Sequence, residues 1–201
     1  MRELILEKGY ADITITDLAK RSRISVSHFL YYFPSKEAVL EEVCRDLLTT
    51  ALAEINSRRG ADVQHRIEHL TRMIFSRSTV PRPEFGFFLE ILVLSMHYPR
   101  VKKLFDEYSL GVADYLVDLF SRVPRADGRS PEDTASIVTA LWGGLLNTAM
   151  FDPKLNEHRA RALFRSMLFS LAGIEPARAV ESLASRGRFE KRTADAAAHH
   201  M

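Results

Sequence analysis

Proline and helix-capping residues divide this sequence into segments with helical periodicity, and this division limits the possible folds more than any other feature. Apolar residues recur at three- and four-residue spacing in most segments, and no segment alternates strictly between apolar and polar residues. The nine glycines and eight prolines are few for a chain with many strands and turns. We therefore predict an all-α fold.

The expected helices are short at the start of the chain and longer afterwards. The first three cover 4–8, 15–22 and 26–33, and the third ends there because Pro34 disfavours helical geometry in the residue before it. Longer helices are expected from Ser35 to about Ile55, and over 62–78, 83–97, 99–122, 130–151 and 156–172. The run S-P-E-D at 130–133 is the clearest start, because it combines a cap, a first-turn proline and two acids.

Composition excludes several classes of protein. The single cysteine, Cys44, excludes a disulfide framework and a multi-cysteine zinc site, and it fits a reducing cytoplasm. The charged first residues leave no room for the apolar core of a signal peptide. The uncharged stretch 134–151 reaches the lower length limit of a membrane span, but its polar residues and the pair Gly143-Gly144 favour a buried helix. We expect a cytoplasmic protein without a membrane segment.

The region from Thr14 to Lys36 has the pattern of a helix-turn-helix. Thr14 and Asp17 have the spacing of a capping box, and only three residues separate the second helix from the third. Apolar residues stand at the packing positions Leu18, Ala19, Ile24 and Phe29. The segment from Leu18 to Lys36 holds four basic residues and no acid: Lys20, Arg21, Arg23 and Lys36. Such local positive charge favours the attraction of phosphate.

Position in the motif gives each candidate DNA-binding residue a role. The first turn of the helix that begins at Ser25 would enter the major groove, with Val26, Ser27 and His28 at base edges. Sugar and phosphate contacts are expected from Thr16, Tyr31, Tyr32 and Lys36. The alternative for any one residue is a structural role, with Ser25 and Ser35 only capping helices and the tyrosines packing on the core.

The stretch G-Y-A-D-I-T-I-T-D-L-A-K-R-S-R-I-S-V-S-H-F-L-Y-Y-F-P-S-K-E-A-V-L, residues 9–40, resembles the DNA-binding domain of the tetracycline-repressor (TetR) family of bacterial regulators. The resemblance implies a homodimer of about nine helices per subunit, whose variable C-terminal domain binds a small ligand that usually relieves repression. It places the base and phosphate contacts on Thr16, Val26, Ser27, His28, Tyr31, Tyr32 and Lys36. The expected divisions are a DNA-binding domain at 1–48, a ligand-binding and dimerisation domain at 49–175, and a tail at 176–201 that is disordered or a frayed helix.

Three positions depart from the family pattern. Arg23 stands at a turn position that is often glycine, so a left-handed backbone there would be strained. Leu30 replaces a tyrosine that commonly faces the DNA backbone. The helix before Gly9 is also short, which leaves an alternative function open: a helical dimer that binds small molecules or proteins and has weakened DNA affinity.

Two apolar stripes with aromatic residues mark the candidate ligand pocket. Such stripes are more often plain core, but the resemblance favours a cavity among these helices. An apolar pocket needs a few polar contacts, which Tyr108, Tyr115, Trp142 and Asn147 can supply. The remaining candidate lining residues are Phe85, Phe88, Leu89, Leu92 and Met96. No acidic pair or arginine cluster stands among them, so the expected ligand is a neutral or aromatic, hydrophobic compound.

The last two strong helices form the candidate dimer surface. The segment 134–151 is rich in small residues, and the final helix has a broad apolar face that includes Leu163 and Met167. A single subunit cannot readily bury both of these helix surfaces. A four-helix bundle across a two-fold axis would place the two reading heads one DNA turn apart, about 34 Å, and predicts a roughly palindromic operator.

Enzyme functions find little support in the sequence. The run H-R-I-E-H from His65 to His69 matches a zinc-protease pattern, but short patterns recur by chance and its helix is a generic amphipathic one. No glycine-rich phosphate loop or nucleophile elbow occurs, and Cys44 is expected to be an inert buried thiol. We predict a ligand-responsive transcriptional regulator, a repressor rather than an enzyme, with no cofactor and no metal.

Overall fold

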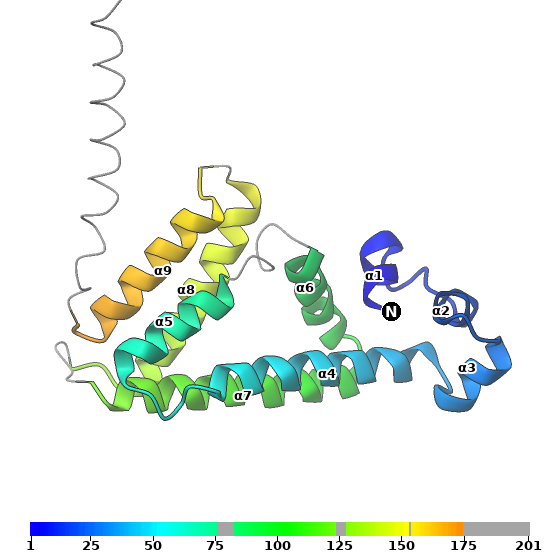
Figure 1. Ribbon diagram of the computed structural model, residues 1–201, viewed down its shortest axis with the longest axis horizontal. Helices are drawn as coiled ribbons and strands as arrows, with labels where there is room; N and C mark the ends of the chain where they lie inside the picture. Colours follow the sequence, from blue (N-terminus) through cyan, green and yellow to red (C-terminus); the bar gives the residue numbers. More distant parts are fainter. Residues whose placement is uncertain (76–82, 124–127, 153, 175–201) are drawn as a thin grey trace, which may run out of the picture.

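Two long helices lie side by side along the longest axis of the molecule, and one of them reaches the small end of the molecule (Figure 1). The computed structural model describes residues 1–75, 83–123, 128–152 and 154–174, which form nine helices and confirm the all-α prediction. Their bounds are α1 (Arg2–Lys8), α2 (Ile15–Ser22), α3 (Val26–Tyr32), α4 (Lys36–Asn56), α5 (Val63–Ile74), α6 (Pro83–Ser95), α7 (Pro99–Ser121), α8 (Pro131–Phe151) and α9 (Glu157–Leu171).

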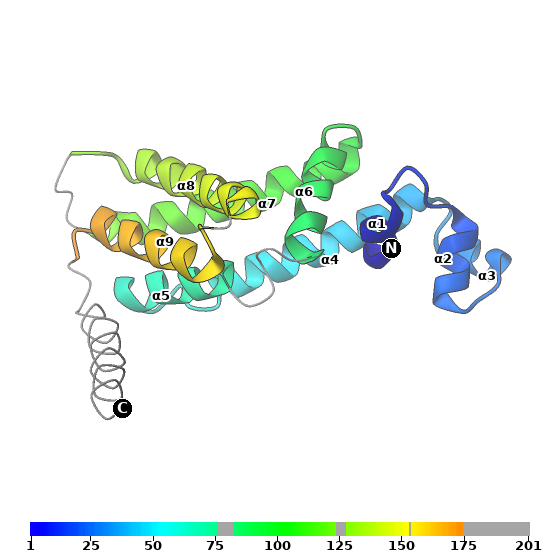
Figure 2. The same ribbon diagram turned by 90° about the horizontal axis from the view of Figure 1, so that it is seen from above.

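The helices divide into a small head and a larger body. The head consists of α1, α2 and α3 at one end of α4, and the body packs α5, α8 and α9 around the far part of α7 (Figure 2). Helix α6 lies between the two and touches both α1 and α7. Helix α4 is continuous across residue 48, so the expected division between domains falls inside a helix that head and body share.

Hydroxyl caps start the head helices where the sequence predicts them. The Thr14 hydroxyl accepts a hydrogen bond from the Asp17 amide (3.1 Å), and the Asp17 carboxylate accepts one from the Thr14 amide (2.8 Å), so the capping box is complete. Ser25 and Ser35 cap α3 and α4 with their hydroxyl groups alone, which accept from the amides of His28 and Ala38. These local bonds fix the ends of three helices within 22 residues of chain.

The turn between α2 and α3 places Arg23 in the left-handed region, at φ 58° and ψ 37°. No other described residue except glycine has a positive φ. The Ile24 amide donates to the Ala19 carbonyl (3.1 Å), which closes the end of α2. The chain therefore keeps the tight turn despite the missing glycine and carries the strain of a left-handed arginine.

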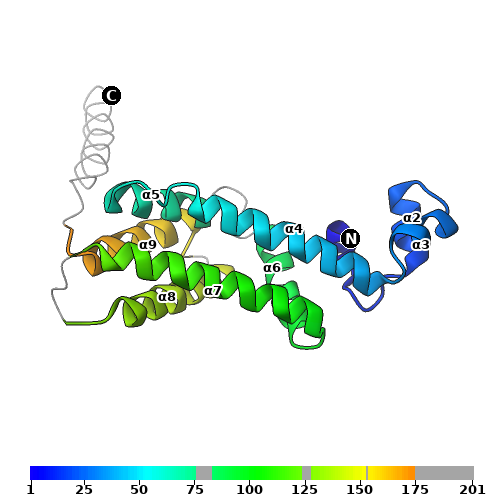
Figure 3. The ribbon, with the colours of Figure 1, turned by 90° about the horizontal axis from the view of Figure 1, so that it is seen from below.

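Helices α4 and α7 lie side by side (Figure 3), and Gly111 of α7 faces Leu52 of α4. A methyl group on Gly111 would lie 2.6 Å from a side-chain carbon of Leu52, so the absence of a side chain permits this contact. The two helices thus join the head to the body as a pair.

A fully buried arginine ties α5 to α7, a feature that the sequence did not suggest. Arg66 donates hydrogen bonds to the Asp118 carboxylate (2.8 Å) and to the Tyr115 carbonyl (3.1 Å). Its guanidinium also lies 4.5 Å from the centre of the Tyr115 ring. A buried charge with this many partners fixes the register between the two helices.

The helix ends agree closely with the expected ranges, with one exception. Helix α5 ends at Ile74, and Phe75 follows it, whereas the sequence predicted a helix to residue 78. The expected tail, residues 176–201, lies outside the described residues. None of the described helices combines the length and the apolar character that crossing a membrane requires.

Candidate functional site

Helix α3, the second helix of the helix-turn-helix, packs on the core through one buried residue and exposes the rest of its surface. Phe29 is its buried residue, and it packs in the core with Leu18 and Ala19 of α2. The N-cap Ser25 accepts a hydrogen bond from the His28 amide (3.2 Å), which fixes the first turn. The helix is therefore a rigid rod, one side of which faces away from the protein.

The predicted DNA-binding residues other than Lys36 are exposed, and most of them lie on α3. Tyr31 and Tyr32 are 82% and 62% exposed, and the rings of Tyr32 and His28 lie 5.4 Å apart. Exposed side chains also occur at the remaining candidates outside Lys36: Thr16, Ser25, Val26 and Ser27. Large exposed aromatic side chains on a short helix are unusual for a core role and suit contact with another molecule.

Lys36 occupies a different position from the one expected. Its ammonium donates to the carbonyl oxygens of Tyr10 (3.3 Å), Ala11 (3.1 Å) and Ile13 (3.2 Å), and it lies 4.7 Å from the centre of the Tyr10 ring. Three acceptors use the three N–H donors of a lysine. In this structure Lys36 therefore closes the loop between α1 and α2 rather than facing outward to a phosphate.

Positive charge on the head is also less free than the sequence suggests. Arg21 forms ion pairs with Glu3 (2.6 Å) and Glu7 (2.7 Å) of α1. Lys20 and Arg23 are exposed and form no ion pair with another described residue. Of the four basic residues counted in the motif, these two remain available for phosphate.

A second candidate site is a pocket of about 390 Å³ between α6, α7 and α8. Six predicted ligand residues line it: Phe88, Leu89, Leu92, Tyr108, Trp142 and Asn147. The Phe88 ring lies 5.5 Å from Phe105, 6.4 Å from Tyr108 and 6.3 Å from Trp142, centre to centre. Four aromatic rings thus form one wall cluster in the pocket.

Polar atoms in this pocket are few. Burial raises the pKa of Tyr108 to about 12, so its phenol stays protonated at neutral pH. The indole N–H of Trp142 is buried and has no hydrogen-bond acceptor among the described residues. The described lining contains no acidic or basic side chain. The pocket suits a ligand with a largely apolar surface.

Three predicted ligand residues lie elsewhere. Tyr115 is buried against Arg66 and lines only a small neighbouring crevice, because the Arg66 guanidinium holds its ring and its backbone carbonyl. Met96 lies in the turn after α6 and is 78% exposed, since the helix ends at Ser95. The Phe85 side chain lies outside the described residues.

Six further residues complete the pocket, and the sequence analysis missed them: Phe105, Ser109, Val112, Thr139, Gly143 and Leu146. Each stands one to four positions from a predicted residue, Tyr108 or Trp142, on the same helix. Extending the two stripes by helical spacing around these aromatic residues would have found them.

The histidines of the H-R-I-E-H run bind separate partners. The imidazole of His65 contacts the Asp62 carboxylate (2.6 Å), and that of His69 contacts the Glu54 carbonyl (2.9 Å). Glu68 forms an ion pair with Arg165 of α9. Within the described ranges, no three potential metal-ligand side chains gather at one point.

Cys44 is fully buried in α4. Burial raises the pKa of its thiol to about 12, so the reactive thiolate is absent at neutral pH. The prediction of a buried cysteine is confirmed.

The outer faces of α8 and α9 expose apolar side chains. Phe151 at the end of α8 is 77% exposed, and Leu163 and Met167 of α9 are also exposed. Gly144 lies exposed on α8, where a Cβ atom would meet nothing within 4 Å. This face is the predicted dimer surface.

Family models match both parts of the chain. Residues 2–43 match the family described as bacterial regulatory proteins of the tetR family, and residues 63–173 match the BetI-type transcriptional repressor C-terminal domain. The chain belongs to the TetR family, with a BetI-type C-terminal domain. As a TetR-family regulator it is a DNA-binding transcriptional repressor, and the family is not one of enzymes.

Curated relatives agree with this membership. The BetI regulator of Ectopseudomonas mendocina is 30% identical over 157 residues, which cover 75% of this chain and 80% of the relative. The regulator BetI 1 of Chromohalobacter salexigens is 29% identical over 166 residues, covering 80% and 81%. The family resemblance seen in residues 9–40 is therefore confirmed and extends through the body.

Solved structures share the fold of this TetR-family chain. A transcriptional regulator from Saccharomonospora viridis, solved in complex with choline, superposes with a TM-score of 0.69 at 21% identity, covering 83% of this chain and 90% of that one. A regulator from Rhodococcus sp. Rha1 gives a TM-score of 0.70 at 18% identity, covering 87% and 95%.

Proposed function

We propose that this repressor is a homodimer that binds a roughly palindromic operator and is released from it by a small ligand in the pocket between α6, α7 and α8. The observation that carries the proposal is the pairing of an exposed recognition helix with a separate, aromatic-walled pocket in one chain. Helix α6 lies between the two, because it lines the pocket and also contacts α1. A ligand that shifts α6 would therefore act on the head.

The ligand is proposed to be small and largely apolar, with either a neutral aromatic body or a quaternary ammonium group. The sequence predicts the neutral class, which fits a lining without charged side chains. The four aromatic rings also suit a quaternary ammonium group, because their faces attract cations. The relative from Saccharomonospora viridis, which was solved with choline, supports including this second class.

Direct binding tests the DNA part of the proposal. Fluorescence anisotropy with the DNA upstream of the protein's own gene should show specific binding that weakens steeply as salt rises. The alternative of a helical dimer with weakened DNA affinity predicts only weak binding without preference over unrelated DNA of equal length. That result would reject the operator-binding proposal.

The ligand part is tested by titrating the protein–DNA complex with choline and with neutral aromatic compounds of similar volume. A true effector should raise the melting temperature of the free protein and release the DNA. Trp142→Ala, which removes one pocket wall, should abolish both effects while operator binding without ligand stays intact. Release that persists in this variant would place the ligand outside the pocket.

The dimer is proposed to form through α8 and α9. The exposed apolar residues there need a cover, and a two-fold arrangement of these helices provides one. Sedimentation equilibrium should show a dimer at micromolar concentration, and Leu163→Asp should convert it to monomer because it places a charge in an apolar interface. Tyr31→Asp is the matched control, since that residue is exposed on the head and should leave the dimer unchanged.

A further inference from the structure

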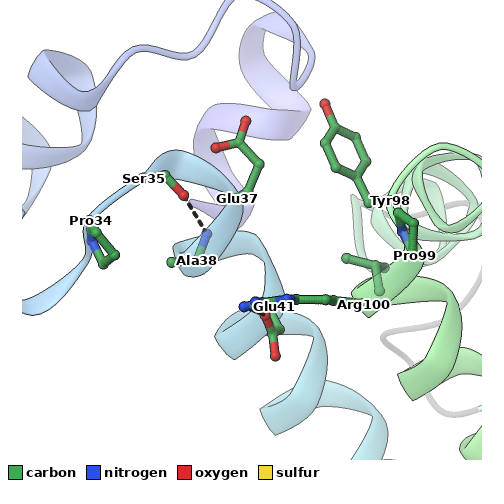
Figure 4. Close-up of a pocket in the computed structure, with 9 residues that line it drawn as sticks. Pro34, Ser35, Glu37, Ala38, Glu41, Tyr98, Pro99 and Arg100 are labelled. Carbon is green, nitrogen blue, oxygen red and sulfur yellow. Dashed lines mark hydrogen bonds and ion pairs between the residues drawn. The ribbon is translucent and has the colours of Figure 1, made fainter.

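A second cavity lies where the head joins the body, and no function has yet been given to it. This groove, of about 530 Å³, runs between the start of α4 and the start of α7 (Figure 4). Residues 34–41 supply lining on the head side, and residues 98–101 supply it on the body side. None of these residues lines the pocket between α6, α7 and α8, so the two cavities are separate.

The groove combines an apolar surface with one aromatic ring. Its apolar lining comes from Pro34, Ala38, Pro99 and Val101. The Tyr98 side chain stands at one end and packs edge-on against Tyr10, with ring centres 5.3 Å apart. The Tyr10 contact holds the Tyr98 ring in place, so the groove has a fixed aromatic wall for a small organic molecule.

Carboxylates give the groove its charge. Figure 4 shows Glu37 and Glu41 on α4 opposite Tyr98 and Arg100 at the start of α7. Glu37 accepts one long hydrogen bond, from the Tyr10 hydroxyl (3.4 Å), and no other described side chain pairs with it. A carboxylate can accept about four hydrogen bonds, so Glu37 keeps most of its capacity.

The protein itself places a cation in this groove. Glu41 pairs with Arg45 of the same helix (2.8 Å), and the Arg100 guanidinium, 85% exposed, lies 3.4 Å from its other oxygen. Such exposed pairs are weak and are displaced easily. An anion would meet both carboxylates, and the amide of Ala38 in the first turn of α4 is already bonded to the Ser35 hydroxyl (3.1 Å). The groove therefore favours a positively charged ligand over a negatively charged one.

We propose that this groove is a second ligand site, which binds a primary ammonium group carried on a short aromatic or apolar body. The ammonium group pairs with Glu37 and Glu41, and the body packs on Val101, Pro99 and the Tyr98 ring. Arg45 and Arg100 compete with the ligand for Glu41, so Glu37 is the carboxylate that is open to it. Since the two walls belong to the head side and to the body, the bound ligand bridges the joint between them.

Calorimetry on the full-length protein without DNA tests the site with a matched set of probes. Phenethylamine carries the proposed ammonium group, 2-phenylethanol is its neutral counterpart, and phenylacetate is the anion of similar size. Phenethylamine should bind more tightly than 2-phenylethanol by about fivefold, the factor that one ion pair of about 1 kcal/mol provides. Phenylacetate should bind least. Equal binding of all three would overturn the proposal.

Variants locate the site and give effects of opposite sign. The double variant Glu37→Gln and Glu41→Gln should remove the preference for phenethylamine, because it removes both carboxylates. Arg100→Ala should tighten phenethylamine binding, because it removes one of the two cations that pair with Glu41. Trp142→Ala alters only the other pocket and should leave the phenethylamine affinity unchanged.

Two results would place the amine elsewhere and overturn the proposal: loss of binding in Trp142→Ala, or no change in the double glutamine variant. Weaker phenethylamine binding in Arg100→Ala would also contradict the proposal, because removing a competing cation should not weaken the binding of the amine. Melting curves confirm that each variant is folded. Operator DNA takes no part in these titrations, so their failure would leave the proposed repressor function standing.

Discussion

The head and the body place their functional residues in opposite ways. The head carries most of its candidate DNA contacts on one exposed seven-residue helix, α3, whereas the pocket draws its walls from three helices between Phe88 and Asn147. Short-range bonds such as the Ser25 cap fix the head. Long-range packing fixes the body, with Arg66 as a buried tie between α5 and α7. Changes in the body should therefore cost stability, and changes on the head should cost DNA affinity.

The largest effect is expected at the buried tie. Arg66→Met should lower the free energy of unfolding by about 3 kcal/mol, because it removes a buried charged donor to the Tyr115 carbonyl and a partner of Asp118. Burial raises the pKa of Asp118, but hydrogen bonds from Arg122 and Arg66 outweigh this and keep it below its usual value. Urea unfolding measures the loss.

Arg59→Met is the matched control for this change. Arg59 pairs with Asp114 (2.7 Å) and more distantly with Asp118 (3.6 Å) on the same side of α7, but it is only half-buried and Asp114 is exposed. Ion pairs that stay open to solvent contribute less than about 1 kcal/mol, so the loss should be small. Equal losses in the two variants would show that burial of the Arg66 guanidinium does not set the stability of the body.

On the head, the expected effect concerns affinity rather than stability. His28→Ala should weaken operator binding by about 1–2 kcal/mol, because it removes a hydrogen-bonding side chain from the first turn of α3. The urea midpoint should stay unchanged, since His28 is exposed and only its backbone amide bonds to Ser25. Lys154→Ala, an exposed change on the body, should leave operator affinity intact. A loss of stability in His28→Ala would break the contrast between head and body.

This contrast also explains how much the sequence could predict. Caps, prolines and the helix-turn-helix spacing act within a few residues, so helix boundaries and the exposure of Tyr31 and Tyr32 followed from local rules. The roles of Lys36 and Tyr115 did not follow. Each is decided by a partner distant in the chain: the carbonyls of the loop between α1 and α2 for Lys36, and Arg66 for Tyr115.

The pocket was predictable in part for the same reason. Helical spacing placed Phe88 and Trp142 on faces that meet, and both line the pocket. Spacing alone could not show that the α6 stripe stops before Met96, because the end of α6 depends on the turn that leads into Tyr98 and α7. The sequence thus predicts a residue's position well where it depends on the spacing within one helix, and poorly where it depends on contacts between two helices.

A smaller effect is expected from the strained turn in the head. Arg23→Gly should raise the free energy of unfolding by up to about 1 kcal/mol, because glycine adopts a left-handed backbone without the clash that arginine suffers. Arg23→Lys keeps both the charge and the strain and should show no gain. Thermal melting compares the two. No stabilisation by glycine would mean that the arginine side chain makes up for its backbone strain.

The smallest effect concerns the pH response of the capping box. Hydrogen bonds from Lys8 and from the hydroxyl and amide of Thr14 hold the pKa of Asp17 well below its usual range. A carboxyl whose pKa is lower in the folded state stabilises that state above its unfolded pKa, and this contribution is lost as the pH falls toward the folded value. The Asp17 carboxyl should therefore titrate at lower pH than the other aspartates when it is followed by NMR. Thr14→Val should move the titration of Asp17 to higher pH. Thr49→Val, an exposed change in α4, should leave it unchanged. Equal titration of Asp17 in both variants would show that the cap does not stabilise the start of α2 through this charge.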